Sequence, residues 1–205
     1  STKDHMTRHP SEALHAASND LLELMRHRHH VAPKRLISPG PSAQQLQQIF
    51  QAASHAPDHG RIQPWRFILV PDKARSELGD AFAQALRLRD PDANPTDLDA
   101  AHDKAFRAPC LILAVVRSLP SDPPVPMVER LISLGCAIQN MLLMAQTLSL
   151  GSGITSGQAM NSPGIRKLFA LTEHEEGICF LNFGTIASHK PARHRADPSE
   201  FVSSL

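Results

Sequence analysis

Residues 56–67 read Ala-Pro-Asp-His-Gly-Arg-Ile-Gln-Pro-Trp-Arg-Phe, and this stretch decides how the chain on either side of it is arranged. Its two prolines and its glycine predict a sharp turn between a helix that Pro57 ends and a strand that starts near Arg66. The turn carries an Asp, a His, an Arg and a Gln, which can all hydrogen-bond a ligand when a rigid scaffold holds the loop. The alternative is a plain connector with solvated polar side chains, in which Trp65 fills the core.

Outward from this turn, hydrophobic periodicity predicts one α+β domain over residues 19–205, preceded by a flexible extension over residues 1–18. The first expected helix is short, is capped by Asn19 or Asp20 and runs through Leu21, Leu22 and Met25. A second helix is expected to follow Ser42. The other expected helices are Lys73–Leu88, Leu98–Ala105, Met127–Leu148 and Ser162–Phe169. The expected strands are Arg66–Val70, Cys110–Val116 and Ile178–Ile186, with loops over Val31–Pro41 and Gly151–Gly157 and a polar tail over Ala187–Leu205.

The composition excludes several classes of protein. The 205 residues carry 21 Lys and Arg against 20 Asp and Glu, a formal charge of +1, so no global field favours nucleic acid or a membrane surface. Apolar runs such as Met141–Ala145 are too short to span a bilayer, and the N-terminus lacks the apolar stretch of a secretory signal. Cys110, Cys136 and Cys179 stand far apart among apolar neighbours, which favours reduced thiols in a cytoplasmic protein.

At the 56–67 turn the sequence resembles the nitroreductase-like flavoproteins, and within them the short branch of NAD(P)H nitroreductases with Asp-His in this loop. Three further segments agree with that branch in order and spacing. They are Arg28–Lys34 ahead of Pro39-Gly40-Pro41, Phe106-Arg107-Ala108-Pro109, and Gly135-Cys136-Ala137. The resemblance spans about Leu21 to Val202. It implies a nitroreductase-like fold, with a central mixed or antiparallel sheet flanked by helices and a C-terminal tail that embraces the partner subunit.

The resemblance also implies an FMN site at the subunit interface of a homodimer. In that family the basic triplet at 28–30 contacts the flavin from one subunit, and the two histidines of the loop contact it from the loop side. The segment 154–156 meets the isoalloxazine or the phosphate from the partner chain, and one of two tail arginines adds a second cation for the phosphate. The implied residues are Arg28, His29, His30, His55, His59, Ile154, Thr155, Ser156, and Arg193 or Arg195.

Three departures from the family pattern affect the charge of this site. The triplet is usually Arg-Arg-Ser, but here His29 and His30 follow Arg28, His55 stands where Arg is common, and 154–155 read Ile-Thr in place of Trp-Arg. Neutral imidazoles keep hydrogen-bonding capacity but lose fixed charge, so we predict FMN affinity that weakens as the histidines deprotonate. Without the resemblance, the alternative is that His27, His29 and His30 form a solvated basic patch at a helix end. A metal site is not expected, because consecutive residues cannot easily aim three imidazoles at one ion.

If FMN binds, the resemblance implies a ping-pong cycle in which NADH or NADPH reduces the flavin and leaves. A nitroaromatic, a quinone or a similar small acceptor then takes the electrons in the same place. Arg28 or Arg61 is expected to stabilise the reduced flavin, and His59, beside Asp58, is the candidate proton donor. The alternative for Asp58 and His59 is an Asx-type turn that fixes the loop. Two other functions stay open: an FMN-binding or sensing protein with little NAD(P)H turnover, and a helical interaction module that binds no flavin.

Overall fold

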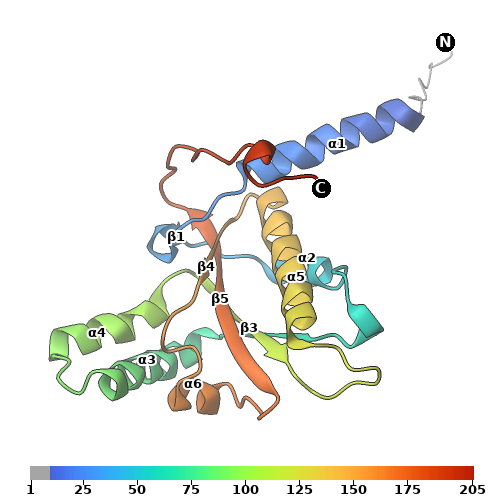
Figure 1. Ribbon diagram of the computed structural model, residues 1–205. Helices are drawn as coiled ribbons and strands as arrows, with labels where there is room; N and C mark the ends of the chain where they lie inside the picture. The colour runs from blue at the N-terminus through green and yellow to red at the C-terminus, as the bar shows by residue number, and fades with distance from the viewer. Residues whose placement is uncertain (1–9) are drawn as a thin grey trace.

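The computed structural model describes residues 10–205 and shows an antiparallel sheet with helices packed on both faces (Figure 1). The strands are β1 (Leu36–Ile37), β2 (Trp65–Leu69), β3 (Cys110–Arg117), β4 (Gly151–Thr155) and β5 (Glu175–Ile186). The helices are α1 (Pro10–His27), α2 (Ala43–Ala53), α3 (Arg75–Arg89), α4 (Pro95–Asp103), α5 (Met127–Thr147) and α6 (Pro163–Leu168). Short 3₁₀ turns are η1 (Pro33–Arg35), η2 (His59–Arg61), η3 (Asp72–Ala74), η4 (Lys104–Phe106) and η5 (Pro198–Glu200).

The sheet is built around β5. The strand order is β1-β5-β3-β2, and β4 pairs with β5 as well. All of these strand pairs are antiparallel. The predicted α+β class, with an antiparallel sheet flanked by helices, is therefore confirmed.

The apolar run that predicted a central strand is explained by burial on both faces of β3. Successive side chains of a strand point to opposite faces. Ile112 and Ala114 pack with α2 and α5, whereas Leu111 and Leu113 pack with α3 and α6. A strand covered on both sides has no place for polar residues, so its sequence is apolar throughout.

The sequence features that predicted two of the helices are found in the structure. Ser42 caps α2 with a capping box, in which Gln45 N–H donates to the Ser42 hydroxyl and Ser42 N–H donates to the Gln45 side chain. α5 is long and apolar enough, by length and composition alone, to cross a membrane. One such helix is weak evidence for a membrane span, because a core helix passes the same test, and Leu134 and Met141 of α5 are buried in the core beside the sheet.

Two sequence predictions are wrong. The segment Gly151–Gly157 is not a loop, because its first five residues form β4. Its glycines allow close packing rather than backbone flexibility, because a Cβ on Gly151 would clash with the side chains of Ile186 and Leu36. The first helix does not begin at Asn19 or Asp20, because α1 starts at Pro10, so the described part of the predicted extension is helical and residues 1–9 lie outside the described residues.

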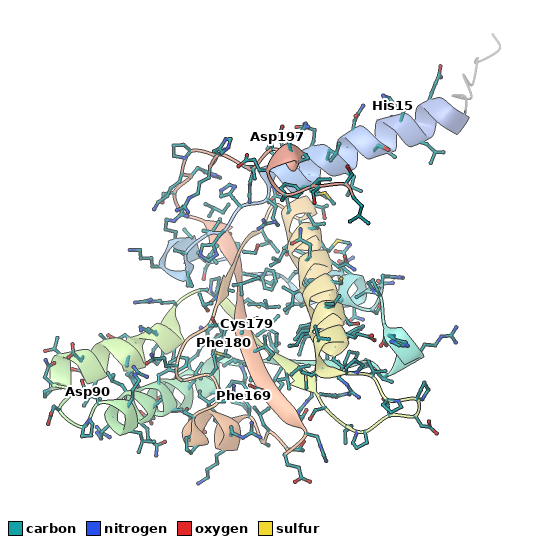
Figure 2. The ribbon with its side chains drawn as sticks, in the orientation of Figure 1. His15, Asp90, Phe169, Cys179, Phe180 and Asp197 are labelled. Carbon is teal, nitrogen blue, oxygen red and sulfur yellow. The ribbon has the colours of Figure 1, made fainter. Side chains whose placement is uncertain are left out.

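The C-terminal tail turns back across the end of α1 (Figure 1). It contains η5, capped by Asp197, which accepts hydrogen bonds from the backbone and hydroxyl of Ser199 (labelled in Figure 2 at Asp197). Phe201 near its end is 70% exposed. The tail therefore brings late residues of the chain next to the triplet at 28–30.

Candidate functional site

The basic triplet at 28–30 follows α1 and lies against β4. His30 forms a parallel bridge with Ser152, and the Val31 N–H donates to the Ser152 carbonyl oxygen over 2.9 Å. Gly153 permits this approach, because a Cβ there would clash with the Val31 carbonyl oxygen. The backbone thus fixes the triplet beside the sheet.

Arginines from distant parts of the chain gather around His30. Burial lowers the pKa of His30 below its ordinary value of 6.5, and nearby positive charges lower it further. Those charges belong to Arg35, Arg193 and Arg28. Arg195 donates to the Arg28 carbonyl oxygen over 2.9 Å, and burial together with its charge lowers the pKa of Arg28. We call these five residues the cation cluster.

No acidic group balances the positive charge of the cation cluster among the residues that act on it. None of the groups that shift the pKa of His30 or of Arg28 is acidic. Two buried nitrogen atoms, His29 Nε2 and Arg35 Nε, have no hydrogen-bond partner among residues 10–205. A buried polar atom left unpaired costs about 1–3 kcal/mol, so such atoms beside unbalanced charge point to a ligand. A phosphate group, with its acceptor oxygens and negative charge, fits this donor set.

Arg35 is the member of the cluster that the sequence analysis missed. It ends η1, and its guanidinium donates to the carbonyl oxygen of Ser188, 153 positions away, over 2.7 Å. The only nearby sequence signal was the family-like Pro33-Lys34 that precedes it. No local pattern shows that the start of the tail returns to this turn.

The end of β4 lies between the cation cluster and a cavity. Asn182 of β5 is buried and donates from Nδ2 to the Thr155 hydroxyl over 3.0 Å, which fixes the strand end. Thr155 and Ser156 line a cavity of about 450 Å³ that extends toward α3 and α4, and Pro33 of η1 lines it too. Ile154, in contrast, is 42% exposed.

One chain joins segments that we expected to reach the flavin from different subunits. The triplet bridges to Ser152, only two residues before Ile154, and the tail arginines close over it. Residues 28–30, 152–156 and 193–195 therefore form one continuous surface within a single chain. The sequence analysis had placed 154–156 on the partner of the chain that supplies the triplet.

The 58–63 loop is fixed from within. The Asp58 carboxylate accepts hydrogen bonds from the backbone N–H groups of Ile62 and Gln63, over 3.2 and 2.8 Å. The loop needs this support, because Gly60, Arg61 and Gln63 all have positive φ, which L side chains rarely adopt. Asp58 therefore fixes the loop, as the alternative predicted, but its bonds reach four and five residues along the chain and are not those of an Asx turn.

His59 does not pair with Asp58. Its Nδ1 instead contacts the Glu129 carboxylate in the first turn of α5, an ion pair that the sequence analysis did not find. His55 follows the end of α2 and is exposed. The segment between α2 and β2, which carries both histidines, lies on the opposite side of α5 from β1 (Figure 1). A single chain does not bring them to the cation cluster.

Two buried cysteines and the arrangement of potential metal ligands bear on whether other chemistry is present in the described residues. Burial raises the pKa of Cys110 and of Cys179 to about 11, so neither is a thiolate near neutral pH. Among residues 10–205, no group of three or more His, Cys, Asp and Glu side chains could hold a metal ion.

The fold and the cation cluster define an α+β protein with a group of arginines, without an acidic partner, beside one end of its sheet. The chain belongs to the nitroreductase family, whose family model matches residues 37–185. The resemblance found from the motifs is therefore confirmed.

Curated and solved relatives agree with this assignment. The chain is 34% identical over 185 residues to the "Putative NAD(P)H nitroreductase YdjA" of Escherichia coli (strain K12), covering 90% of this chain and 98% of that protein. It resembles the structure of a nitroreductase-like family protein from Bacillus cereus, with a TM-score of 0.75, 18% identity and coverage of 90% and 95%. A nitroreductase with bound FMN from Bacteroides fragilis gives a TM-score of 0.69, 19% identity and coverage of 91% and 99%.

Proposed function

We propose that this protein is an FMN-dependent oxidoreductase that transfers hydride from NADH or NADPH to a nitroaromatic, a quinone or a similar small acceptor. The observation that carries the proposal is the cation cluster, whose positive charge has no acidic partner among the described residues and whose Arg35 Nε is buried without a hydrogen-bond partner. The family of the chain supports the reaction class. Bound FMN supplies the hydride chemistry, and the protein positions and tunes it.

The phosphate of FMN would lie in the cation cluster. Arg28, Arg35 and the tail arginines would donate charge-assisted hydrogen bonds to its oxygens, since a planar guanidinium matches such acceptors. The isoalloxazine ring would extend from there along residues 154–156, which Asn182 holds in place by donating to the Gly153 carbonyl oxygen and to the Thr155 hydroxyl. The acceptor would then enter from the adjoining cavity.

The proposal includes a homodimer, because the segment between α2 and β2 that carries His55 and His59 lies across α5 from β1 within one chain (Figure 1). A partner subunit would bring its 58–63 loop to the flavin. Apolar side chains exposed on α5 and on the tail support such an interface: Val128 is 63% exposed, Ile132 60% and Phe201 70%. Scattered exposed apolar residues are normal, but a face of the long helix that carries several indicates an interaction surface. The tail would embrace that partner.

Proton delivery to the acceptor would fall to His59. The contact of its Nδ1 with Glu129 leaves Nε2 as the nitrogen that can face a ligand. The preorganised charge of Arg28, or of Arg61 from the partner's loop, would stabilise negative charge on the reduced cofactor. The three free cysteines support a cytoplasmic location, which cell fractionation would test.

The experiment begins with the absorbance spectrum of the protein after addition of FMN and gel filtration. A flavin spectrum at one FMN per subunit, lost in Arg28→Ala, is the expected result. Oxidation of NADH and NADPH is then measured with a nitroaromatic and with a quinone, and the mass in solution is measured by light scattering. A colourless protein would overturn the proposal. FMN binding without turnover would instead favour a flavin-binding or sensing role, and a monomer that keeps FMN would remove the dimer.

A further inference from the structure

The cavity beside the end of β4 has an apolar floor. The floor includes Phe82 and Leu86 of α3, Leu111 of β3 and Phe180 of β5. The rings of Phe82 and Phe180 meet edge to face with centroids 5.8 Å apart, and Figure 2 shows Phe180 on the sheet above Phe169. A volume of about 450 Å³ suits a small ring-bearing molecule, since ligand pockets span about 300–1,000 Å³.

The rim of the same cavity is positively charged. Arg89 ends α3, and Lys104 and Arg107 flank the η4 turn that leads into β3. Asp97 is the one carboxylate among the described residues that line the cavity. None of the three cations forms an ion pair with any residue in the described part of the chain. Their charge is therefore available to a ligand in the cavity.

The segment that carries Lys104 and Arg107 is held in place from the interior. The buried guanidinium of Arg75 donates to the carbonyl oxygens of Ala105, Arg107 and Ala108 over 2.9, 2.8 and 2.9 Å. A rim fixed in this way loses less conformational entropy when a ligand binds. The bonds go to backbone oxygens, so the exposed side chains of the two cations are not used by the fold.

We propose that this cavity selects electron acceptors that are aromatic and carry a carboxylate, as nitrobenzoates do. The ring would pack on the apolar floor, and the carboxylate would pair with Lys104 and Arg107. This inference rests on the proposed function, because the acceptor must be reduced where Thr155 and Ser156 meet the flavin. In each turnover a hydride from NAD(P)H and a proton from solvent break one N–O bond of the nitro group, giving the nitroso compound, water and NAD(P)⁺.

The test compares two acceptors of equal shape, para-nitrobenzoate and the neutral para-nitrobenzamide. The ratio of their kcat/KM values is measured for the FMN-loaded protein and for Lys104→Gln, Arg107→Gln and the double variant. Arg87→Gln is the matched control, since Arg87 is an exposed cation near the end of α3 that does not line the cavity. We expect a preference for the benzoate that falls about fivefold in each single variant and further in the double variant. The control should keep the wild-type ratio.

Three results would overturn the inference. The first is an equal ratio in all variants. The second is loss of bound FMN in Lys104→Gln or Arg107→Gln, which would assign the cavity to the flavin. The third is a preference for NADPH over NADH that these variants abolish, which would assign the rim to a cosubstrate phosphate.

A direct titration keeps the inference testable even if the protein binds no FMN. Binding of para-nitrobenzoate and para-nitrobenzamide to the protein without added flavin is followed by NMR. Tighter binding of the benzoate that Arg107→Gln removes would support the cavity assignment while the proposed function fails. Equal binding of the two compounds would overturn the inference independently.

Discussion

The cation cluster and the 58–63 loop both contain histidines, but they differ in whether their polar and charged groups have partners within the chain. The cation cluster gathers four arginines and His30 without an acidic partner, and two buried nitrogens, Arg35 Nε within it and His29 Nε2 next to it, are unpaired. The 58–63 loop has partners for its polar groups, because Asp58 bonds to the backbone of the loop and His59 contacts Glu129 of α5. Both regions have similar residue types, so composition does not separate them. Unbalanced charge indicates a ligand site, whereas balanced hydrogen bonds indicate structural support.

The largest effect should come from the cluster. Arg35→Ala removes the arginine that ties η1 to the tail and places its guanidinium beside His30. We expect the Kd for FMN to rise about 10- to 100-fold, because hydrogen bonds to charged groups contribute about 1.5–3 kcal/mol. Fluorescence titration of FMN measures this. Arg87→Ala serves as control, and an unchanged Kd in Arg35→Ala would remove the arginine from the site.

The loop should respond in stability rather than in binding of the phosphate. Asp58→Ala removes both acceptors of the backbone N–H groups of Ile62 and Gln63. We expect the free energy of unfolding to fall by about 1–2 kcal/mol, as for loss of a capping residue. Urea denaturation checks this, with the exposed Asp99→Ala as control. If Asp58→Ala kept full stability but lost FMN, Asp58 would contact the cofactor instead of fixing the loop, and the contrast would fail.

The pH dependence of FMN binding tests whether the charge of the cation cluster acts on the ligand. The pKa of His30 is lowered in the unliganded chain by burial and by its arginine neighbours, and a bound phosphate would raise it. Binding then takes up a proton, so affinity rises as pH falls from the pKa of the complex toward that of the free protein, which lies below 6.5.

Titrations of wild type and His30→Asn between about pH 5.5 and 8 isolate this effect, because titration of the FMN phosphate itself is common to both proteins. We expect the wild type to gain affinity toward low pH relative to the variant, by several-fold. Identical pH profiles would show that His30 does not sense the phosphate.

The smallest effect is expected for Glu129→Gln. The His59–Glu129 pair is solvent-exposed, and exposed ion pairs contribute about 0.2–1 kcal/mol. The free energy of unfolding should fall by less than about 1 kcal/mol, measured by urea denaturation, while FMN affinity stays within about twofold. A large loss of FMN without a loss of stability would show that Glu129 positions His59 for the ligand.

Local signals predicted most of the fold. The apolar run of β3, the capping box at Ser42 and the apolar α5 each act over a few residues, and each gave the observed element. The error at 151–155 has a physical reason. Gly and Ser have low strand propensity, but here the glycines admit the backbone of Val31 and the side chains of β1 and β5.

Prediction of the site was limited in the same way. The triplet and the tail arginines came from the family resemblance, and the structure joins them through the Arg195–Arg28 bond. Arg35 and Glu129 were missed because their partners lie 153 and 70 positions away. Such contacts depend on topology, which periodicity and turn signals do not contain.

The return of the tail to the triplet also has a consequence for biosynthesis. Arg193 and Arg195 follow β5, the strand around which the sheet is built, so they are translated after every strand of the sheet. Under the proposed function, the complete cation cluster can hold the phosphate of FMN only after the whole sheet has been made. We therefore expect capture of the cofactor to follow the folding of the core rather than to guide it.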